Sequence, residues 1–553
     1  MGQIGTMRRR VTRATAIVVA AGFAAGALSS CSGGPAPSST VAVDTGTRPN
    51  QDVVALYTDR AAAVDAALTL LPSQIDDALR RSKVPGLAVA VVSHDAVLYT
   101  NGFGVRDEST GAKVDADTVF QIASLSKPIS ATILAKAMTQ DPSLTWSTPA
   151  HTLMPGLALA DHYVTQNITV GDFFAHRSGI PTGGGDDLED LGFDRNYILS
   201  HLSEIPLQPF RTTYQYSNFG LTTGAEAVAA SRGQSWEQMS KELLFSPLGM
   251  TSTSTSHADF LSAPNHAVLH ARIAEDDFQP LFDRDPDAEA PAGGVSSNVR
   301  DLATWMQLLL SDGSRDGSAF INSDPLNQAL SAQIVSSHAG DLDQRPGHYG
   351  FGINVGSAAG GRVTLSHSGA FGLGAATAAT LVPDLDLGIV VLTNGAPVGL
   401  PEAVVQIFLD EVMYGHQSRD WVDTMHGFFA GFNAPSGDLA GQSPPTDAAA
   451  SAPASDYVGT YTSAYFGTLT VTEAGGRLRG ALGPTGATTF DITPWNGDTM
   501  AYVPTGENAL PGSLSSVVFA RSGGAVTTAT FTYLNRYPHI AEPSGLGVFT
   551  RQR

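Results

Sequence analysis

The chain has 553 residues, of which 42% are hydrophobic and 15% are charged, so it can bury a large core and is not an intrinsically disordered protein. Thirty-one basic and 52 acidic side chains give a formal net charge of −21 at pH 7, which argues against nucleic acid and anionic lipid surfaces as partners. At roughly 150 residues per domain, the length predicts about two to four domains.

The first thirty residues resemble a secretory signal. Arginines between positions 8 and 13 precede an apolar run from Ala14 to Leu28, which is too short and wrongly flanked to persist as a transmembrane helix. The run Leu28-Ser29-Ser30-Cys31 resembles the bacterial lipobox, in which the cysteine is lipidated. We therefore expect a lipoprotein signal peptide over 1–30, a lipid on Cys31, and an exported protein anchored to the outer face of the bacterial cytoplasmic membrane. Ordinary cleavage that leaves Cys31 as a free thiol is the alternative.

Cys31 is also the only cysteine in the chain, which excludes disulfides, cysteine catalysis and thiolate metal sites. After it, residues 31–50 are rich in Gly, Pro, Ser and Thr and predict a flexible tether.

Residues 51–432 predict one large α+β domain. Helices are expected over 51–81, 128–138, 298–310 and 402–413, and strands over 86–92, 96–99, 349–355, 362–366, 375–382 and 388–392. Irregular and helical segments fill the stretch from about 140 to 290. Helices that bracket an antiparallel sheet, with a helical insertion between its strands, indicate an α+β fold rather than a doubly wound sheet.

The C-terminal part differs in character. Residues 433–455, rich in Pro, Ser and Ala, predict a linker. Residues 456–553 contain short strand-like runs broken by Gly and Asn, at 457–461, 467–471, 499–503, 517–519 and 528–533. This pattern predicts a small all-β barrel or sandwich that forms a separate domain.

The first motif that carries chemistry is S-x-x-K at Ser124 and Lys127. The chain has only five lysines, and no other lysine has a serine three residues before it. Positions i and i+3 share a helix face, so the lysine amine can hold or relay the proton of the serine hydroxyl. The motif is the signature of serine β-lactamases and penicillin-binding proteins.

The second motif is Y-x-N at Tyr216 and Asn218. A phenol whose pKa is lowered by a neighbouring ammonium can act as general base, and the asparagine amide can hold a substrate carbonyl. The same pattern starts at Tyr99 and Tyr533, but only Tyr216 lies in the helical insertion. A turn with a packed tyrosine is the structural alternative.

The third motif is His367-Ser368-Gly369, which we expect just after a strand and before a glycine-rich turn. Relatives of S-x-x-K proteins often carry K-T-G at this place, but no lysine follows Lys241 in this chain. A lone histidine is more often structural than catalytic; its position after a strand favours a role in the site.

With these motifs in order, residues 51–415 resemble the class C β-lactamase and D-aminopeptidase family of serine hydrolases, which includes esterases and carboxypeptidases. Four more runs carry the resemblance: Phe120 to Ala123, His176 to Ile180, Pro291 to Ser297 and Leu392 to Asn394. Residues from Asp456 resemble the lipocalin-like barrel that some members append.

The resemblance implies that Ser124 attacks a carbonyl, that Lys127 and Tyr216 exchange its proton, and that an acyl-enzyme forms and is hydrolysed. Backbone N–H groups of Ser124 and Ala370 would hold the oxyanion. Asn218, Ser368 and Gly369 would complete the substrate-binding set, and no cofactor or metal is expected. His367 in place of lysine, as a neutral imidazole, would attract the carboxylate of a β-lactam less than an ammonium does, which favours esterase or D-aminopeptidase activity over β-lactamase activity.

The sequence thus predicts a cell-envelope serine hydrolase that acts through an acyl-enzyme on small ester or amide substrates, D-amino-acid and peptidoglycan-derived peptides included. A non-catalytic, penicillin-binding-protein-like envelope sensor and a true β-lactamase are the alternatives. A metalloenzyme is disfavoured because the 14 histidines include no H-E-x-x-H, and the glycines from 369 to 374 lack the strand–helix setting of a dinucleotide loop. The C-terminal domain could gate the site, bind a ligand or form oligomers, and the sequence does not choose between these roles.

Overall fold

The computed structural model describes residues 60–340, 345–358, 361–507 and 509–553. The predicted signal peptide, the predicted lipid site at Cys31, the tether and the first residues of the first helix lie outside this range. None of the helices in the described part is long and apolar enough to cross a bilayer.

The centre of the larger domain is an antiparallel sheet, which has nine strands within the described residues. Its strands in spatial order are β10 (Ile334–Ser337), β11 (Gly347–Tyr349), β12 (Asn354–Ser357), β13 (Val363–Phe371), β14 (Ala375–Val382), β15 (Leu387–Thr393), β1 (Gly86–Val92), β2 (Val97–Asp107) and β3 (Ala112–Lys113). The adjacent strands β14, β15 and β1 are buried along their whole length because helices cover both faces of the sheet. Continuous apolar runs such as Gly86–Val92 are typical of strands buried on both sides.

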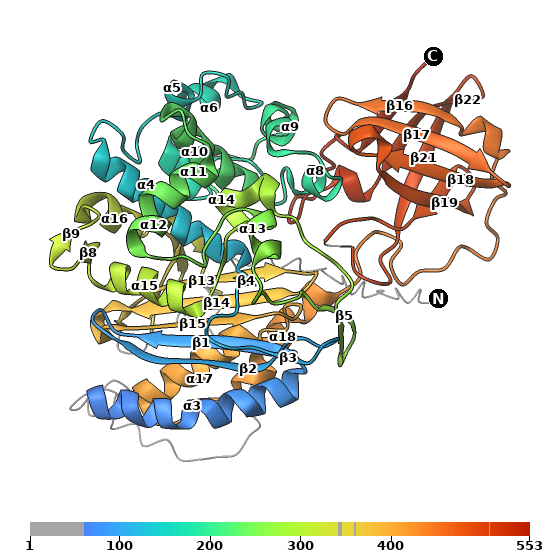
Figure 1. Cartoon of the computed structure of the whole chain (residues 1–553). Helices are drawn as coiled ribbons and strands as arrows, with labels where there is room; N and C mark the ends of the chain where they lie inside the picture. The colour runs from blue at the N-terminus through green and yellow to red at the C-terminus, as the bar shows by residue number, and fades with distance from the viewer. Residues whose placement is uncertain (1–59, 341–344, 359–360, 508) are drawn as a thin grey trace, which may run out of the picture.

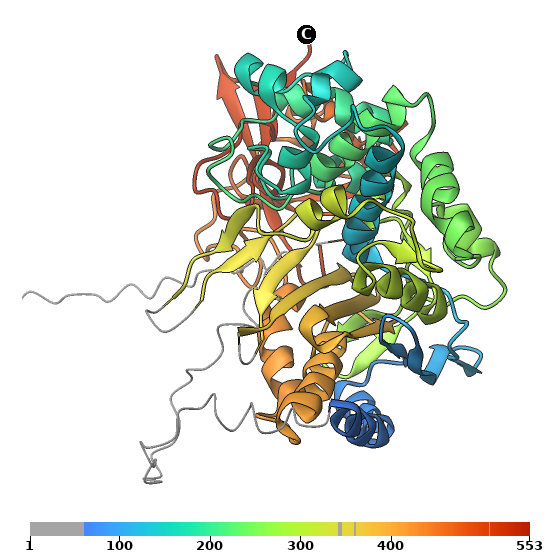
Figure 2. The ribbon, with the colours of Figure 1, turned by 90° about the vertical axis from the view of Figure 1, so that its left-hand side faces the viewer.

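Two layers of helices cover the sheet (Figure 1). On one face lie α3 (Arg60–Ser82), α17 (Leu400–Tyr414) and α18 (Trp421–Phe429); Figure 2 shows α3 and α17 side by side. On the other face lies α15 (Val299–Leu310), whose apolar stripe packs on the sheet and whose first turn is capped by the Asn298 side chain, which accepts the Asp301 N–H.

The helical region sits above α15 and contains mostly short helices. Its helices are α4 (Ser126–Gln140), α5 (Ala150–Leu153), α6 (His162–Asn167), α7 (Val170–Phe174), α8 (Asp186–Asp190), α9 (Arg195–Ser200), α10 (Asn218–Ser231), α11 (Trp236–Ser240), α12 (Ser246–Leu248), α13 (His257–Ser262), α14 (Ala290–Gly293) and α16 (Ser323–Ala329). Short strand pairs also form within the described residues: β4 (Phe120–Gln121) with β7 (Ser296–Ser297), β5 (Ala271–Ala274) with β6 (Asp277–Gln279), and β8 (Ser314–Arg315) with β9 (Ser318–Ala319).

The C-terminal strands close into a barrel. They are β16 (Gly459–Ser463), β17 (Gly467–Ala474), β18 (Arg477–Leu482), β19 (Thr488–Asn496), β20 (Thr499–Tyr502), β21 (Ser515–Ser522), β22 (Ala525–Phe531) and β23 (Val548–Arg551). The α+β fold with a small all-β C-terminal barrel is therefore confirmed. The barrel does not stand apart, because Tyr465 and Phe466 share one apolar core with Phe173, Leu188 and Phe219 of the helical region.

Two strand predictions need correction. The strand predicted over 349–355 is a hairpin of β11 and β12, because Gly352 adopts φ +76° between them and a side chain there would meet the Lys127 carbonyl oxygen at 2.7 Å. The strand predicted over 362–366 continues to Phe371, which places His367, Ser368 and Gly369 inside β13 rather than after it.

Candidate active site

Ser124 lies on a short 3₁₀ turn, η2 (Ala123–Leu125), between β4 and α4. Ala123 has φ +48°, a conformation that costs a residue with a Cβ about 1 kcal/mol or more. The Ser126 hydroxyl holds the turn, because it donates to the Ala123 carbonyl at 2.6 Å and accepts the Val295 N–H at 2.9 Å. Strained turns of this kind cluster at functional sites, and this one presents a serine that is 8% exposed.

Lys127, in the first turn of α4, is fully buried beside that serine. Its Nζ donates to Ser124 Oγ at 2.9 Å, to Asn218 Oδ1 at 2.8 Å and to the Ala292 carbonyl oxygen at 2.9 Å. Three acceptors match the three N–H bonds of an ammonium. Burial nevertheless lowers the pKa of Lys127 to about 8, against the opposing effect of nearby carboxylates, so a free amine is accessible near neutral pH.

Tyr216 packs against the same lysine, with Nζ 4.6 Å from the centre of its ring. Burial raises the pKa of Tyr216 well above its usual value. The nearby Ser124 hydroxyl acts in the opposite direction and lowers this pKa. The Tyr216 hydroxyl nevertheless forms no hydrogen bond with any described residue. The prediction of a lowered pKa was wrong, because desolvation outweighs any effect of the nearby amine, and Tyr216 is a neutral phenol.

His367 is buried within β13 and held at both ring nitrogens. Its Nδ1 lies 2.6 Å from the Ser368 carbonyl oxygen, and its Nε2 lies 2.9 Å from the Tyr349 hydroxyl. Because a carbonyl can only accept, Nδ1 carries the proton and Nε2 accepts from Tyr349. Burial, followed by the charge of Lys127, lowers the pKa of His367 to about 3, so the imidazole is neutral at pH 7 as expected.

The strand β13 touches the serine turn at Gly369. A Cβ at this position would meet the Ile122 carbonyl oxygen at 2.2 Å and the Leu125 nitrogen at 3.1 Å, so only glycine allows this approach. Ala370, the next residue, is half-buried. The Ser368 side chain points to the opposite face of the sheet, because side chains alternate along a strand. There it lies beside the buried Glu402. Burial raises the pKa of Glu402 to about 7, and the Ser368 hydroxyl partly opposes this rise. The structure therefore does not bring the Ser368 hydroxyl to Ser124.

The structure thus brings together Ser124, Lys127, Tyr216 and Asn218, with His367 and Gly369 on the neighbouring strand. Sequence reasoning assigned no role to the aromatic residues behind Tyr216. The His176 ring lies 4.5 Å from the Tyr216 ring and 5.0 Å from the Tyr349 ring, and His176 Nδ1 accepts the Ser217 N–H at 3.1 Å. The run from His176 to Ile180 contributed only to the family resemblance, and no local sequence pattern indicates a role for Tyr349.

Buried charges around Lys127 also escaped sequence reasoning. Asp186, Glu189 and Glu289 all act on its amine, and Arg284 lies among these acids. These residues are at least 59 positions from Lys127 in the chain, and no motif joins them. Among the described residues, one group has the spacing of metal ligands, namely His94, Asp95 and Asp386, and it shares no residue with this site.

A protein-family model described as Beta-lactamase matches residues 71–409, and a second model, a domain of unknown function (DUF3471), matches residues 443–541. The chain therefore belongs to the beta-lactamase family.

Individual relatives carry several names. The chain is 25% identical over 346 residues to the unguisins hydrolase ungD of Aspergillus violaceofuscus, a match that covers 58% of this chain and 60% of that protein. It is 30% identical to penicillin-binding protein 4 of Amycolatopsis lactamdurans, over 48% of this chain and 69% of that protein. It is 28% identical to the esterase EstB of Burkholderia gladioli, over 34% and 52%.

Solved structures show the same fold. The octameric penicillin-binding protein homologue from Pyrococcus abyssi superposes with a TM-score of 0.54 at 15% identity, over 88% of this chain and all of that one. EstCE1, a hydrolase with promiscuous acyltransferase activity, superposes with a TM-score of 0.55 at 18% identity, over 64% of this chain and all of that one.

Proposed function

We propose that the protein is a cell-envelope serine hydrolase that cleaves ester or amide bonds through an acyl-enzyme on Ser124. The observation that carries the proposal is the 2.9 Å contact between Lys127 Nζ and Ser124 Oγ, made by a buried amine whose pKa is lowered to about 8. A weak hydroxyl nucleophile becomes reactive when an adjacent base can take its proton.

The pKa shifts divide the proton transfers between two groups. The neutral amine of Lys127 takes the proton as Ser124 Oγ bonds to the substrate carbonyl carbon, and the carbonyl electrons move to oxygen. Tyr216, held as a neutral phenol, gives its proton to the leaving oxygen or nitrogen as that bond breaks, and the Lys127 ammonium restores the phenol. Water then attacks the acyl carbon by the same route in reverse and regenerates Ser124.

The developing oxyanion would be held by the N–H groups of Ser124 and Ala370, since β13 abuts the Ser124 turn at Gly369. Loss of one such donor typically costs about 3 kcal/mol of transition-state stabilisation. The Asn218 amide lies beside Lys127 and would hold a carbonyl group of the substrate.

The substrate class follows from His367. Its neutral, doubly hydrogen-bonded imidazole offers no positive charge to a substrate carboxylate. Neutral esters and amides, including D-amino-acid peptides, are therefore favoured over β-lactams, which carry that carboxylate. Attachment to the outer face of the cytoplasmic membrane through Cys31, and oligomers formed through the barrel, are further parts of the proposal, supported by the lipobox-like run and by the octameric relative.

The test uses a serine-directed fluorophosphonate probe and a p-nitrophenyl ester. We expect the probe to label the wild-type protein and not Ser124→Ala, and we expect Lys127→Ala to lose at least about a thousandfold in kcat/KM. The substitution Lys136→Ala is the matched control, since this second lysine of α4 donates to the Phe320 carbonyl instead of a site residue. Equal labelling of the wild-type and Ser124→Ala proteins would refute the proposal.

A further inference from the structure

The acidic helix α8 has two sides that contact different parts of the molecule. Its five residues, Asp186–Asp190, include four carboxylates around the buried Leu188. Gly185 precedes the helix with φ +99°, and a Cβ there would strike the Phe219 ring at 2.5 Å, so the start of α8 is fixed against α10. Four acids on one short helix would ordinarily face solvent; here each of them makes a contact inside the molecule.

The first side faces the Ser124 site. Asp186 Oδ2 accepts from Asn218 Nδ2 at 3.3 Å, and Asn218 Oδ1 in turn accepts from Lys127 Nζ at 2.8 Å. An asparagine amide has a donor end and an acceptor end. Because a carboxylate can only accept, it selects the orientation in which the amide oxygen faces the lysine. The reversed amide would direct N–H groups at the lysine ammonium.

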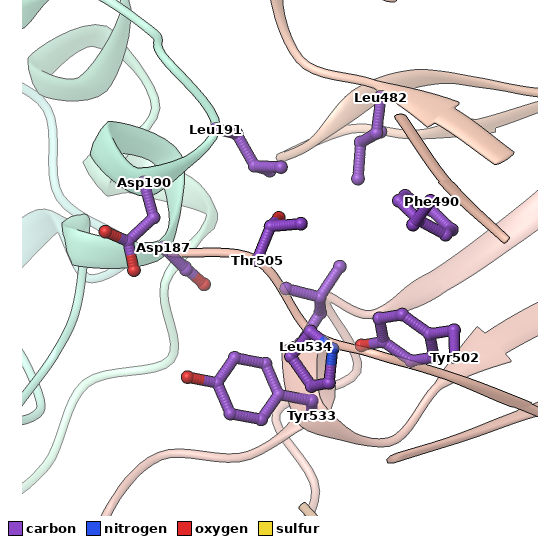
Figure 3. Close-up of a pocket in the computed structure, with 10 residues that line it drawn as sticks. Asp187, Asp190, Leu191, Leu482, Phe490, Tyr502, Thr505, Tyr533 and Leu534 are labelled. Atoms are coloured by element: carbon purple, nitrogen blue, oxygen red, sulfur yellow. The ribbon is translucent and has the colours of Figure 1, made fainter. Parts of the chain in front are cut away.

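The second side contacts the barrel, and Figure 3 shows Asp187 and Asp190 beside the cavity that α8 lines together with barrel residues. The Tyr465 hydroxyl donates to Asp187 Oδ1 at 2.9 Å and accepts the Gly185 N–H at 3.0 Å. The Glu507 N–H donates to Asp190 Oδ1 at 3.1 Å. The cavity that Asp187 and Asp190 line with barrel residues is about 20 Å³, room for about one water molecule.

Arg284 forms a second connection between α8 and the barrel. Its guanidinium donates to Glu189 of α8 at 2.8 Å, to Glu289 at 3.1 Å and to Glu507 of the barrel at 2.8 Å. Glu507 Oε1 also accepts the Gly372 N–H at 2.6 Å, one residue beyond β13. The barrel therefore contacts both α8 and the end of the strand that carries His367.

We infer that α8 couples the barrel to the Ser124 site: Asp186 is a positioning residue that orients Asn218 toward Lys127, and Tyr465 and Glu507 of the barrel hold α8 in place. This inference rests on the proposed function, since it assigns positioning roles around Ser124 and Lys127. It gives Tyr465 and Glu507 of the barrel a positioning role at the Ser124 site.

Two substitutions at one position separate orientation from charge. In Asp186→Asn the new amide oxygen can still accept from Asn218, whereas Asp186→Ala removes the acceptor. We expect Asp186→Ala to lose at least about tenfold in kcat/KM for the ester, and Asp186→Asn to keep most of it. The pH dependence gives a second readout. The groups that face Asp186 are Lys127, Asp187, Glu189 and Asn218. The carboxylates whose charges act on Lys127 are Glu289, Asp186 and Glu189, and all three raise the pKa of its amine. Asp186→Asn should therefore move the acidic limb of the kcat/KM profile to lower pH, a shift that a merely structural role would not produce.

The barrel contacts are tested with a matched pair of tyrosines. Tyr465→Phe removes the hydroxyl that binds α8, and Tyr461→Phe removes a hydroxyl that donates to the Tyr457 carbonyl within the barrel. We expect Tyr465→Phe to lower kcat/KM severalfold and Tyr461→Phe to leave it unchanged, with thermal unfolding used to verify that both proteins fold. Wild-type rates and pH profiles in both Asp186 variants, or equal effects of the two tyrosine variants, would overturn the inference.

The outcome for the wild-type protein keeps the two proposals distinguishable. If the fluorophosphonate labels Ser124 and the ester is hydrolysed while these variants behave as wild type, only the role of α8 fails. If the wild-type protein is neither labelled nor active, the proposed function fails and the inference falls with it.

Discussion

The Tyr349 hydroxyl lies 2.9 Å from His367 Nε2, and this contact holds a neutral imidazole within β13. Both residues are buried, and the other ring nitrogen of His367 donates to the Ser368 carbonyl. A histidine held in this way can shape the wall beside Ser124, but it can neither take up a proton near pH 7 nor supply a positive charge.

The buried histidine should make stability depend on pH. The pKa of His367 is about 3 in the folded protein, so between that value and 6.5 the unfolded chain binds a proton that the folded chain does not. Its contribution is therefore present above pH 6.5 and is lost as pH falls, by up to about 1.4 kcal/mol per pH unit. Unfolding by urea at pH 7 and pH 5 should show a larger loss for wild type than for His367→Gln.

That comparison between variants is needed because Asp186, Asp187 and Glu402 act in the opposite direction. Burial raises the pKa of each to about 7, so these carboxyls bind protons in the folded state first and stabilise it as pH falls from 7 toward 4. The difference between wild type and His367→Gln isolates the histidine. Equal losses for both proteins would contradict a buried neutral His367.

The rate of ester hydrolysis should rise with pH. The reactive form of Lys127 is the free amine, and the pKa of Lys127 is about 8, so kcat/KM should increase about tenfold per unit below pH 8 and level off above it. Because the pKa of Tyr216 is raised above its usual value, no fall is expected up to pH 10. A profile of kcat/KM from pH 6 to pH 10 measures both the rise and the plateau, and a maximum near pH 6 would exclude Lys127 as the base.

Substrate preference should follow the missing positive charge at His367. We expect kcat/KM for nitrocefin to be at least about a hundredfold below that for a p-nitrophenyl ester, since a difference of roughly 3 kcal/mol corresponds to that ratio. Steady-state rates on the two chromogenic substrates are the measurement. Nitrocefin turnover equal to that of the ester would favour the true β-lactamase reading.

Gly369→Ala should damage the Ser124 turn. The added methyl group would meet the Ile122 carbonyl oxygen at 2.2 Å, and overpacking of this kind typically costs about 1–3 kcal/mol. We expect a lower free energy of unfolding and slower fluorophosphonate labelling of Ser124. Gly427→Ala is the control, because it lies in α18, has an ordinary φ and has open space at its Cβ; it should be neutral or slightly stabilising.

Loss of Arg284 should weaken the contact between the barrel and the helical region. Its guanidinium is buried among Glu189, Glu289 and Glu507, and removal of one partner from a buried ion cluster costs about 3–5 kcal/mol. Arg284→Ala should therefore lower the free energy of unfolding by an amount in this range. Arg300→Ala breaks only an exposed pair with Asp117 and should cost less than about 1 kcal/mol.

The strands and helices with clear periodicity could be predicted from the sequence. Gly86–Val92 and the stripe of α15 were evident, since apolar spacing alone defines them. The strand β18, Arg477–Leu482, was missed because arginines alternate with Leu478 and Gly480 along a short segment, which reads as a polar turn. Gly480 belongs there because the Phe490 ring occupies the space of a side chain.

The site was predictable only as far as its motifs extend. Ser124, Lys127 and Tyr216 were named from local patterns, and the structure brings them together. The run Asp186–Asp190 reads as a solvated acidic turn, because carboxylates are seldom buried unless paired. Its burial depends on Arg284 and on the barrel, and such long-range pairing leaves no mark in local sequence.

The apolar core that continues from the helical region into the barrel has a consequence for engineering. Excision of residues after Ser455 would leave Leu188 and Phe219 without their cover from Tyr465 and Phe466. A chimera that contains the barrel of another homologue should therefore also contain that homologue's segment around α8, because the two segments share one packed core.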